Sequence, residues 1–543
     1  MFAPSSHPLP ITFALPRNLP PSPISLPGGS TIETREFDAV ILVSSLSSGI
    51  EGVEKPLKAA GLGGASGMWE SEGVANGWGD KGWQVILEPT PSLTSLRMPG
   101  GWGDALEGLV AAAEVREEGV MPVAEDRVVV MVEGPKRVGK STFARLLLNR
   151  LLAKYDQVAY LDTDLGQPEF SPPGFVSLSV LDSPVLGPSF THPTIPPFSH
   201  YLGALSPASD PAAYNAAVLA LIASYSLTVE FPAHDGRAPN GRIRDRIPLV
   251  VNTQGWVKGL GADLLSKLRQ EAMPTHVFSF DAPEEQHESG SGGGGGWSPE
   301  MAYPEGVAVW RLPAAPSSPL DSKWSASDLR TLSLVSYFHA VIPTTPTHTN
   351  EDGAAPGNVF PTRWDFVLPL VGQAPVAVDW TVQAGLLAGV HVLGGEVAYD
   401  HILHALNGAV VGIVAAPPAS DAADPCAPPA AFPYAPYTPQ PAPAQSRAVG
   451  LAVVRAVVPG TQQLQLLTPV PVEALAGAGP IRLVLGAVEL PLALMLDFNA
   501  SDVESVKGVC GVEWKQVPFL SVEAGEGGGR RRVRRNLMRR GQN

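Results

Sequence analysis

The residues from Gly134 to Ser141 spell Gly-Pro-Lys-Arg-Val-Gly-Lys-Ser and fit the pattern G-x-x-x-x-G-K-[ST]. In this pattern backbone amides surround phosphate oxygens, the lysine reaches the β- and γ-phosphates of a nucleotide, and the hydroxyl residue ligates Mg²⁺. The predicted nucleotide-binding residues are Gly134, Pro135, Lys136, Arg137, Val138, Gly139, Lys140, Ser141 and Thr142. The alternative is an ordinary strand-to-helix turn that fits the pattern by chance.

The flanks of this loop are those that a phosphate-binding loop requires. Residues 128–132 form a β-branched run typical of a buried parallel strand, and residues 142–152 place apolar side chains at helical spacing. The loop therefore opens a helix whose first amides can face phosphate.

Two carboxylates, Asp162 and Asp164, follow a second apolar run at 158–161. Side chains repeat every two residues along an extended chain, so both carboxylates would point to one side. Beside a phosphate-binding loop, such a pair suits phosphoryl transfer, in which it holds hydrated metal and activates a nucleophile. The alternative is a polar strand end or helix cap, and spacing alone does not show which aspartate would be the base.

A third polar segment, residues 252–261, follows the apolar run at 249–251 and contains Trp256 and Lys258. Ligands of open α/β sheets bind where parallel strands end, and a tryptophan beside a lysine suits stacking on a base next to a phosphate. Together with Gln167, these two residues are the predicted substrate-binding residues. A packing role for Trp256 is the alternative.

The three polar segments lie in a stretch, 126–342, in which apolar strands alternate with helices. Strands are expected at 158–161, 249–252, 276–280 and 307–312, and helices at 211–226, 260–271 and 325–339. This alternation predicts an α/β fold: a P-loop NTPase domain whose parallel sheet is covered by helices on both faces. A Gly-rich insertion at 281–300 interrupts it.

The flanks differ in character from this central domain. We expect a disordered Pro/Ser-rich leader at 1–35, a mainly β N-terminal domain at 36–125 with strands at 37–44 and 83–87 and a helix at 104–115, and a β-rich barrel or sandwich at 358–520. A Pro/Ala-rich insertion is expected at 416–446. The tail at 521–543 is basic, with seven arginines between Arg530 and Arg540.

Composition limits the class of protein. A hydrophobic content of 44% indicates a globular chain, and the net charge of -15 provides no global basic field for nucleic acid, although a local basic groove stays possible. Only two cysteines occur, which argues against a disulfide framework and favours a reducing compartment. The first residues lack the apolar core of a secretory signal, and the most apolar uncharged stretch, 211–229, suits a buried helix, so no membrane partner is expected.

Three motifs together resemble one family. Gly-Pro-Lys-x-x-Gly-Lys-Ser-Thr-Phe, Leu-Asp-x-Asp-x-Gly-Gln-Pro-Glu-Phe and Val-Asn-Thr-x-Gly-Trp-x-Lys-Gly-Leu-Gly look like the eukaryotic polynucleotide 5′-hydroxyl kinases, within them the nucleolar pre-rRNA-processing (Grc/NOL-type) branch. The likeness runs from about residue 126 to 380. The middle of the phosphate-binding loop, Arg137-Val138, departs from the small or polar residues common in the family.

The resemblance implies an ATP- and Mg²⁺-dependent enzyme that phosphorylates the 5′-OH end of RNA. By motif position, Lys140, Ser141 and Thr142 would bind phosphates and metal, Asp162 would hold the metal's water shell, and Asp164 would activate the hydroxyl. Trp256 would pack on the terminal nucleotide, and Arg330 would act from a lid near 325–340. The resemblance further implies pre-rRNA as substrate, a Las-type endoribonuclease as partner, and a place in the nucleus and nucleolus.

Two other functions fit parts of the sequence. One is a P-loop GTPase switch, against which the chain contains no N/T-K-x-D segment to read guanine. The other is a scaffolding subunit of an rRNA-processing complex in which the kinase chemistry is secondary.

Overall fold

The computed structural model describes residues 48–62, 98–112, 127–232, 238, 241–281, 303–304, 306–316, 323–343, 357–381, 386–416 and 432–499. It also gives isolated strands at 11–16, 23–25, 31–33, 37–43, 508–509 and 512–513.

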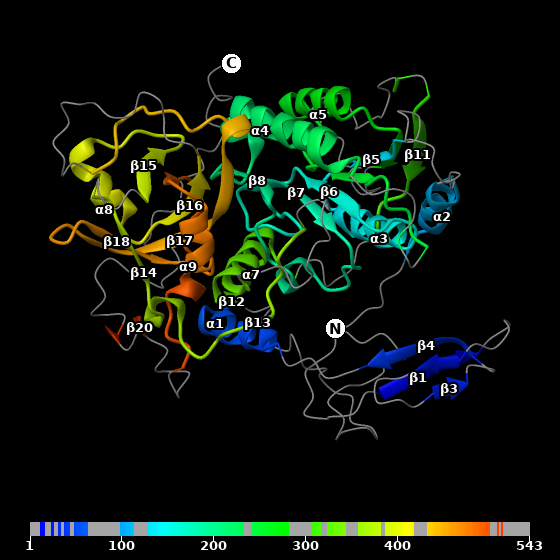
Figure 1. Ribbon diagram of the computed structural model, residues 1–543, viewed down its shortest axis with the longest axis horizontal. Helices are drawn as coiled ribbons and strands as arrows, with labels where there is room; N and C mark the ends of the chain where they lie inside the picture. Colours follow the sequence, from blue (N-terminus) through cyan, green and yellow to red (C-terminus); the bar gives the residue numbers. More distant parts are fainter. Residues whose placement is uncertain are drawn as a thin grey trace, which may run out of the picture.

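A seven-stranded sheet forms the centre of the molecule (Figure 1). Its strand order is β11-β10-β5-β9-β6-β7-β8, and the five strands from β11 to β6 are parallel. These five are β5 (Val129–Glu133), β6 (Val158–Asp162), β9 (Leu249–Asn252), β10 (His276–Phe280) and β11 (Ala308–Leu312). All five lie where the sequence predicted a strand, so the parallel sheet is confirmed.

Helices cover both faces of this sheet, as predicted. On one face α2 (Trp102–Ala112) and α3 (Lys140–Leu152) pack on alternate side chains of β5, such as Val130 and Val132. On the other face α4 (Pro211–Ser224) and α5 (Leu260–Ala272) pack on Val129 and Met131. The two-residue period of the strand thus divides the core into two layers.

The last two strands of the sheet, β7 (Phe175–Leu181) and the edge strand β8 (Phe198–Tyr201), were not predicted, and both pair antiparallel. β7 is buried along its whole length, yet its apolar run is interrupted by Ser177 and Ser179. The run Val176-Ser177-Leu178-Ser179-Val180 alternates apolar and polar residues, which is a strand signal that the sequence prediction did not use.

The carboxy-terminal domain contains one six-stranded sheet in the order β14-β18-β17-β16-β19-β15. Its strands are β14 (Val376–Asp379), β15 (Leu387–Val392), β16 (Val410–Ala415), β17 (Arg447–Val458), β18 (Gln463–Leu467) and β19 (Ile481–Leu485). Helices α8 (Ile402–Leu406) and α9 (Val472–Gly477) cover one face. The β-rich character is confirmed, but the predicted barrel or sandwich is wrong: among the described residues the end strands β14 and β15 do not pair, and the other face packs on the central domain.

The amino-terminal region differs from its prediction. The strand predicted at 37–44 is confirmed as β4 (Phe37–Val43), but its antiparallel partner β1 (Ile11–Pro16) lies within the expected disordered leader. In the same leader β2 (Pro23–Ser25) pairs with β3 (Thr31–Glu33). The run Ile-Thr-Phe-Ala-Leu in β1 has high strand propensity despite its Pro/Ser-rich surroundings. The strand expected at 83–87 lies outside the described residues.

The two helices of the same region do not share a core of their own. α1 (Glu54–Ala59) buries Leu57 against the carboxy-terminal side, whereas α2 buries Trp102 and Leu106 against the central domain. Short strands β12 (Ala340–Val341) and β13 (Arg363–Trp364) then link the two large domains, and β20 (Gly508–Val509) pairs with β21 (Val512–Glu513).

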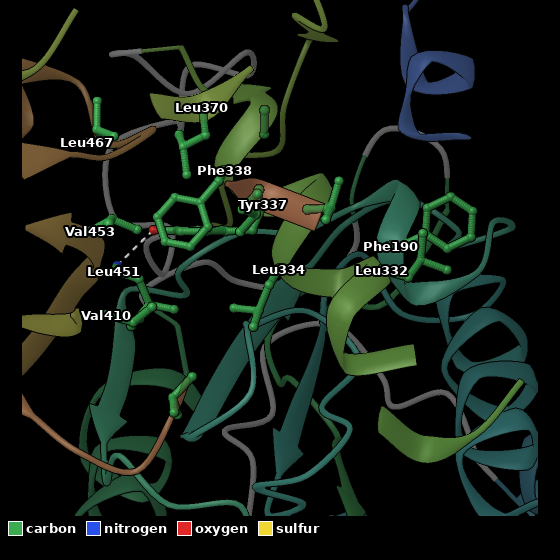
Figure 2. Close-up of a cluster of buried hydrophobic side chains, with 14 of the residues drawn as sticks. Phe190, Leu332, Leu334, Tyr337, Phe338, Leu370, Val410, Leu451, Val453 and Leu467 are labelled. Atoms are coloured by element: carbon green, nitrogen blue, oxygen red, sulfur yellow. Dashed lines mark hydrogen bonds between the residues drawn. The ribbon is translucent and has the colours of Figure 1, made fainter. Parts of the chain in front are cut away.

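Helix α7 (Ala326–His339) lies in the core that joins the central and carboxy-terminal sheets (Figure 2). Its second half is buried, with Tyr337 0% and Phe338 2% exposed. The buried neighbours come from both domains and include Phe190, Val410 and Leu451. The Leu451 amide of β17 donates a hydrogen bond of 2.9 Å to the Tyr337 hydroxyl. The two domains therefore share one hydrophobic core.

One helix among the described residues, Pro211–Val229, has the length and hydropathy that could cross a membrane. It comprises α4 and a π-helical turn at Tyr225–Val229, and it places Tyr214, Val218 and Leu221 in the core beside the central sheet. This agrees with the sequence interpretation of a buried helix.

Replacing Tyr337 with phenylalanine tests the shared core. The change leaves the Leu451 amide buried without its acceptor, which costs about 1–3 kcal/mol. We expect Tyr337→Phe to lower the free energy of unfolding by that amount in urea denaturation. Tyr437 is 82% exposed, so Tyr437→Phe serves as the control and should change stability by less than about 0.5 kcal/mol. Equal stability of the two variants would contradict a bonded interdomain tyrosine.

Candidate active site

Three neighbouring strands bring their polar ends together at one edge of the central sheet. β5 ends at Glu133 and continues into the phosphate-binding loop, β9 ends at Asn252, and β6 ends at Asp162. Asp162 and Asn252 are direct register partners. Since parallel strands end on the same edge, residues more than a hundred positions apart converge there.

The phosphate-binding loop is held in a left-handed conformation at Gly139, where φ is 95°. A Cβ atom at this position would lie 2.9 Å from the ring of Trp102 in α2. The Trp102 ring also packs edge-on against Phe143 and Phe280, and its indole nitrogen donates to the Pro313 carbonyl at 3.0 Å. Helix α2 therefore packs against the phosphate-binding loop. The sequence analysis did not predict this contact, because it assigned α2 to a separate domain.

Lys140 is the first residue of α3 and is only 7% exposed. Its Nζ donates to the Pro135 carbonyl of the same loop at 2.6 Å. Burial lowers the pKa of Lys140 to about 8, the nearby Asp164 charge opposes that shift, and the Lys136 charge adds to it. Phosphate anions held by the loop would favour the charged form of Lys140.

Asp162 is buried in full at the end of β6. Its Oδ2 accepts the Glu169 amide at 2.7 Å and its Oδ1 accepts the Asp164 amide at 3.1 Å. Burial raises the pKa of Asp162 to about 8, with the Asp164 charge adding to the shift and the two amides opposing it. Such a carboxylate suits a site where a cation compensates its charge.

Asn252 connects Asp162 to the phosphate-binding loop. Its Nδ2 donates to Asp162 Oδ1 at 3.3 Å and to Ser141 Oγ at 3.4 Å. Its Oδ1 is buried and has no hydrogen-bond partner among the described residues. Hydroxyl, carboxylate and amide oxygens are the donors that Mg²⁺ prefers, so the predicted metal residues Ser141 and Asp162 fit a Mg²⁺ ion, with Asn252 beside them.

Asp164 occupies a different environment from Asp162. β6 ends at Asp162, so Asp164 lies in a turn rather than on the predicted extended strand. Its Oδ1 accepts the Gly166 amide at 2.9 Å and the Gln167 amide at 3.3 Å. The side chain lines an open cavity of about 240 Å³. The two carboxylates are neighbours, but the turn separates a buried one from an accessible one.

Residues of the phosphate-binding loop and of the predicted substrate-binding segment line the same cavity. Lys136, Asp164 and Trp256 line it, together with Gln254, Gly255 and the segment 205–207. Trp256 is partly buried against the core and also faces the cavity, so both of its interpretations hold in part. Lys258 is exposed and does not line this cavity. The backbone amide of Gln167 donates a hydrogen bond to Asp164, but Gln167 does not line this cavity.

Arg330 lies in the first half of α7 and is half-buried. It is not among the residues that line the 240 Å³ cavity. The second half of its helix is fixed in the interdomain core. The lid role of Arg330 therefore stays a prediction.

Sequence reasoning missed several supporting residues. Glu169, 6% exposed, pairs with Arg145 of α3 and with His192, both at 3.1 Å. Glu133 is fully buried at the foot of the loop and receives two bonds from Arg269 of α5, at 2.9 and 2.7 Å. The sequence offered one signal for such residues, which is a polar residue at the end of an apolar run. Glu133 and Asn252 both have it.

A central parallel sheet with a phosphate-binding loop between its β5 strand and α3 helix, and acidic residues at the next strand end, defines the class of P-loop phosphoryl-transfer proteins. Comparison with known families agrees. The family model described as mRNA cleavage and polyadenylation factor CLP1 P-loop matches residues 134–340.

Curated relatives narrow this class. The polynucleotide 5′-hydroxyl-kinase GRC3 of Cryptococcus neoformans var. neoformans serotype D (strain B-3501A) is 34% identical over 577 residues, covering 100% of this chain and 70% of its own. The grc3 kinase of Schizosaccharomyces pombe is 29% identical over 446 residues, covering 76% of this chain and 54% of its own. The chain therefore belongs to the GRC3 polynucleotide 5′-hydroxyl-kinase family, and it is a kinase.

Solved structures add a weaker likeness. The wild-type Clp1p–Pcf11p complex is 16% identical with a TM-score of 0.41, and covers 72% of this chain and 78% of its own. A second Clp1p–Pcf11p structure is 14% identical with a TM-score of 0.43, at 71% and 79% coverage.

Gly255 offers a test of the cavity geometry. A Cβ atom there would lie 2.5 Å from Cγ and 2.8 Å from Cα of Lys136. Gly255→Ala should push the Trp256 segment away from the loop, at a cost of about 1–3 kcal/mol, and raise the KM for a 5′-OH oligonucleotide by about tenfold or more. Gly395→Ala, where no atom lies within 4 Å, is the control. If Gly255→Ala had the same KM for the 5′-OH oligonucleotide as wild type, the close contact between Gly255 and Lys136 would be refuted.

Proposed function

We propose that the protein transfers the γ-phosphoryl group of ATP to the 5′-hydroxyl end of RNA. The observation that carries the proposal is the 240 Å³ cavity, in which the accessible Asp164 carboxylate and the Trp256 ring share walls with the phosphate-binding loop. Phosphoryl transfer requires donor and acceptor to meet in one place. Membership in the polynucleotide 5′-hydroxyl-kinase family supports the acceptor.

The side chains divide the chemistry between them. The RNA 5′ oxygen attacks the γ-phosphorus, its proton passes to the Asp164 carboxylate, and the bond between the γ-phosphorus and the β–γ bridging oxygen breaks to release ADP. Loop amides and Lys140 stabilise the negative charge that develops on the phosphoryl oxygens. Asp164 is the better candidate for the base because Asp162 is buried and already bonded on both oxygens.

A bound Mg²⁺ ion would supply charge neutralisation at the phosphates. Ser141 and Asp162 would hold it, and the Asn252 amide orients both of them in the structure. Arg330, from α7, is the proposed contributor of positive charge to the transferring group by its match to the family's lid.

Sequence motifs support a proposal for the wider setting of the reaction. The Grc/NOL-type motifs support a role in pre-rRNA internal spacer processing and ribosome biogenesis, with a Las-type endoribonuclease that produces the 5′-OH ends. The arginine-rich stretch 530–540 supports a nuclear and nucleolar location. Copurification of such a nuclease with both wild type and Lys140→Ala would show assembly independent of catalysis.

Substituting Lys140 tests the donor side. Without its positive charge the phosphates lose their main side-chain partner, so Lys140→Ala should reduce phosphate transfer from labelled ATP to a 5′-OH RNA oligonucleotide at least about a hundredfold. Near wild-type transfer in this variant would refute the assignment of the loop. Parallel reactions with GTP and with DNA measure the preference for donor and acceptor.

Substituting Asp164 tests the acceptor side. Asp164→Asn keeps an oxygen for the Gly166 amide but removes the base, so kcat should fall by about 10²- to 10⁴-fold while the KM for ATP stays near wild type. Single-turnover assays with 5′-OH RNA measure the step directly. An unchanged kcat would assign proton acceptance elsewhere.

A further inference from the structure

The phosphate-binding loop contains two lysines in different environments. Lys140 is buried and its Nζ binds a carbonyl within the loop. Lys136 is exposed and lines the 240 Å³ cavity together with Asp164 and Trp256. The general pattern of such loops requires only the lysine at position 140. The outward lysine is therefore available for a second task.

The residues that line the cavity indicate what Lys136 could bind. Among the eight residues that line it, Lys136 is the one cation and Asp164 the one anion. Its volume of 240 Å³ is below the roughly 300–1,000 Å³ of common ligand pockets, which limits it to about one nucleoside. The rest of an acceptor strand must then lie at the mouth.

The phosphodiester nearest to this nucleoside is the first internucleotide phosphate. It is attached to the 3′ oxygen of the ribose that carries the 5′-hydroxyl, so it lies across that one ribose from the oxygen held at Asp164. A flexible ammonium on a four-carbon stem can meet a phosphate at that distance, and a phosphate needs such a cation when it leaves bulk water.

The backbone and first side-chain carbons of Lys136 are packed closely, while the end of its stem stays exposed. Gly255 lies so close to these carbons that an added Cβ would fall 2.5 Å from Lys136 Cγ. The same segment continues into Trp256, whose ring is held by a similarly close contact at Gly261. Lys136 and Trp256 are thus set against each other as parts of one wall.

We propose that Lys136 is a specificity-determining residue of the kinase, binding the first internucleotide phosphate of the acceptor and not the phosphates of ATP. The proposal rests on the kinase function above. It predicts that the enzyme distinguishes a polynucleotide end from a bare 5′-hydroxyl by the negative charge of one phosphodiester.

The test uses two 5′-OH RNA oligonucleotides that differ at the first linkage, one with a native phosphodiester and one with a single neutral methylphosphonate. Wild type should lose about tenfold to a hundredfold in kcat/KM on the neutral linkage, the scale of one charge-assisted hydrogen bond. Lys136→Met should treat the two substrates alike, with the KM for ATP within about twofold of wild type. Lys136→Arg should restore the discrimination.

Lys267→Met is the matched control, because it removes one exposed lysine from α5 outside the cavity. It should keep the wild-type discrimination. A Lys136→Met enzyme that still discriminates, or that mainly loses affinity for ATP, would overturn the proposal while leaving the kinase function intact. Failure of wild type to phosphorylate either oligonucleotide would instead refute the kinase function, and this proposal with it.

Discussion

The burial of the Asp162 carboxylate is the constraint on which the site depends. A buried negative charge is costly unless hydrogen bonds or a cation compensate it. Here two backbone amides and the Asn252 side chain approach its oxygens, and Asn252 also holds Ser141 of the phosphate-binding loop. This polar junction forms only when β5, β9 and β6 are neighbours in the sheet. The site therefore depends on the strand order of the central sheet.

Hydrophobic packing away from Asp162 supports the elements that carry the polar junction. Trp102 packs on the loop from one side, and α7 fills the core between the two sheets from the other. Because α7 belongs to both domains, the carboxy-terminal sheet acts as a support for the kinase domain and not as an independent module. A helix anchored in this way can move little at its buried end, which limits any lid motion to its first turns around Arg330.

One short loop carries positive charge in two environments. Under the proposed function, buried Lys140 lies on the donor side, and exposed Lys136 lies on the acceptor side and lines the cavity with Asp164 and Trp256. The two sides are joined through Gly255, where backbone and loop nearly touch. An enzyme that must align two anionic substrates gains from such a division, since each anion has a cation of its own.

The sequence by itself determined the elements and the donor site. Apolar periodicity located the five parallel strands, and the loop pattern located Lys140 and Ser141, because both signals are local. It did not determine strand β7, the open carboxy-terminal sheet, or strand β1 within a Pro/Ser-rich leader, because which strands pair with one another is not recorded in a local pattern. Only the tertiary structure separated Asp162 from Asp164, added Asn252 and turned Lys136 outward. Burial and accessibility depend on which strands become neighbours, and no spacing along the chain records that.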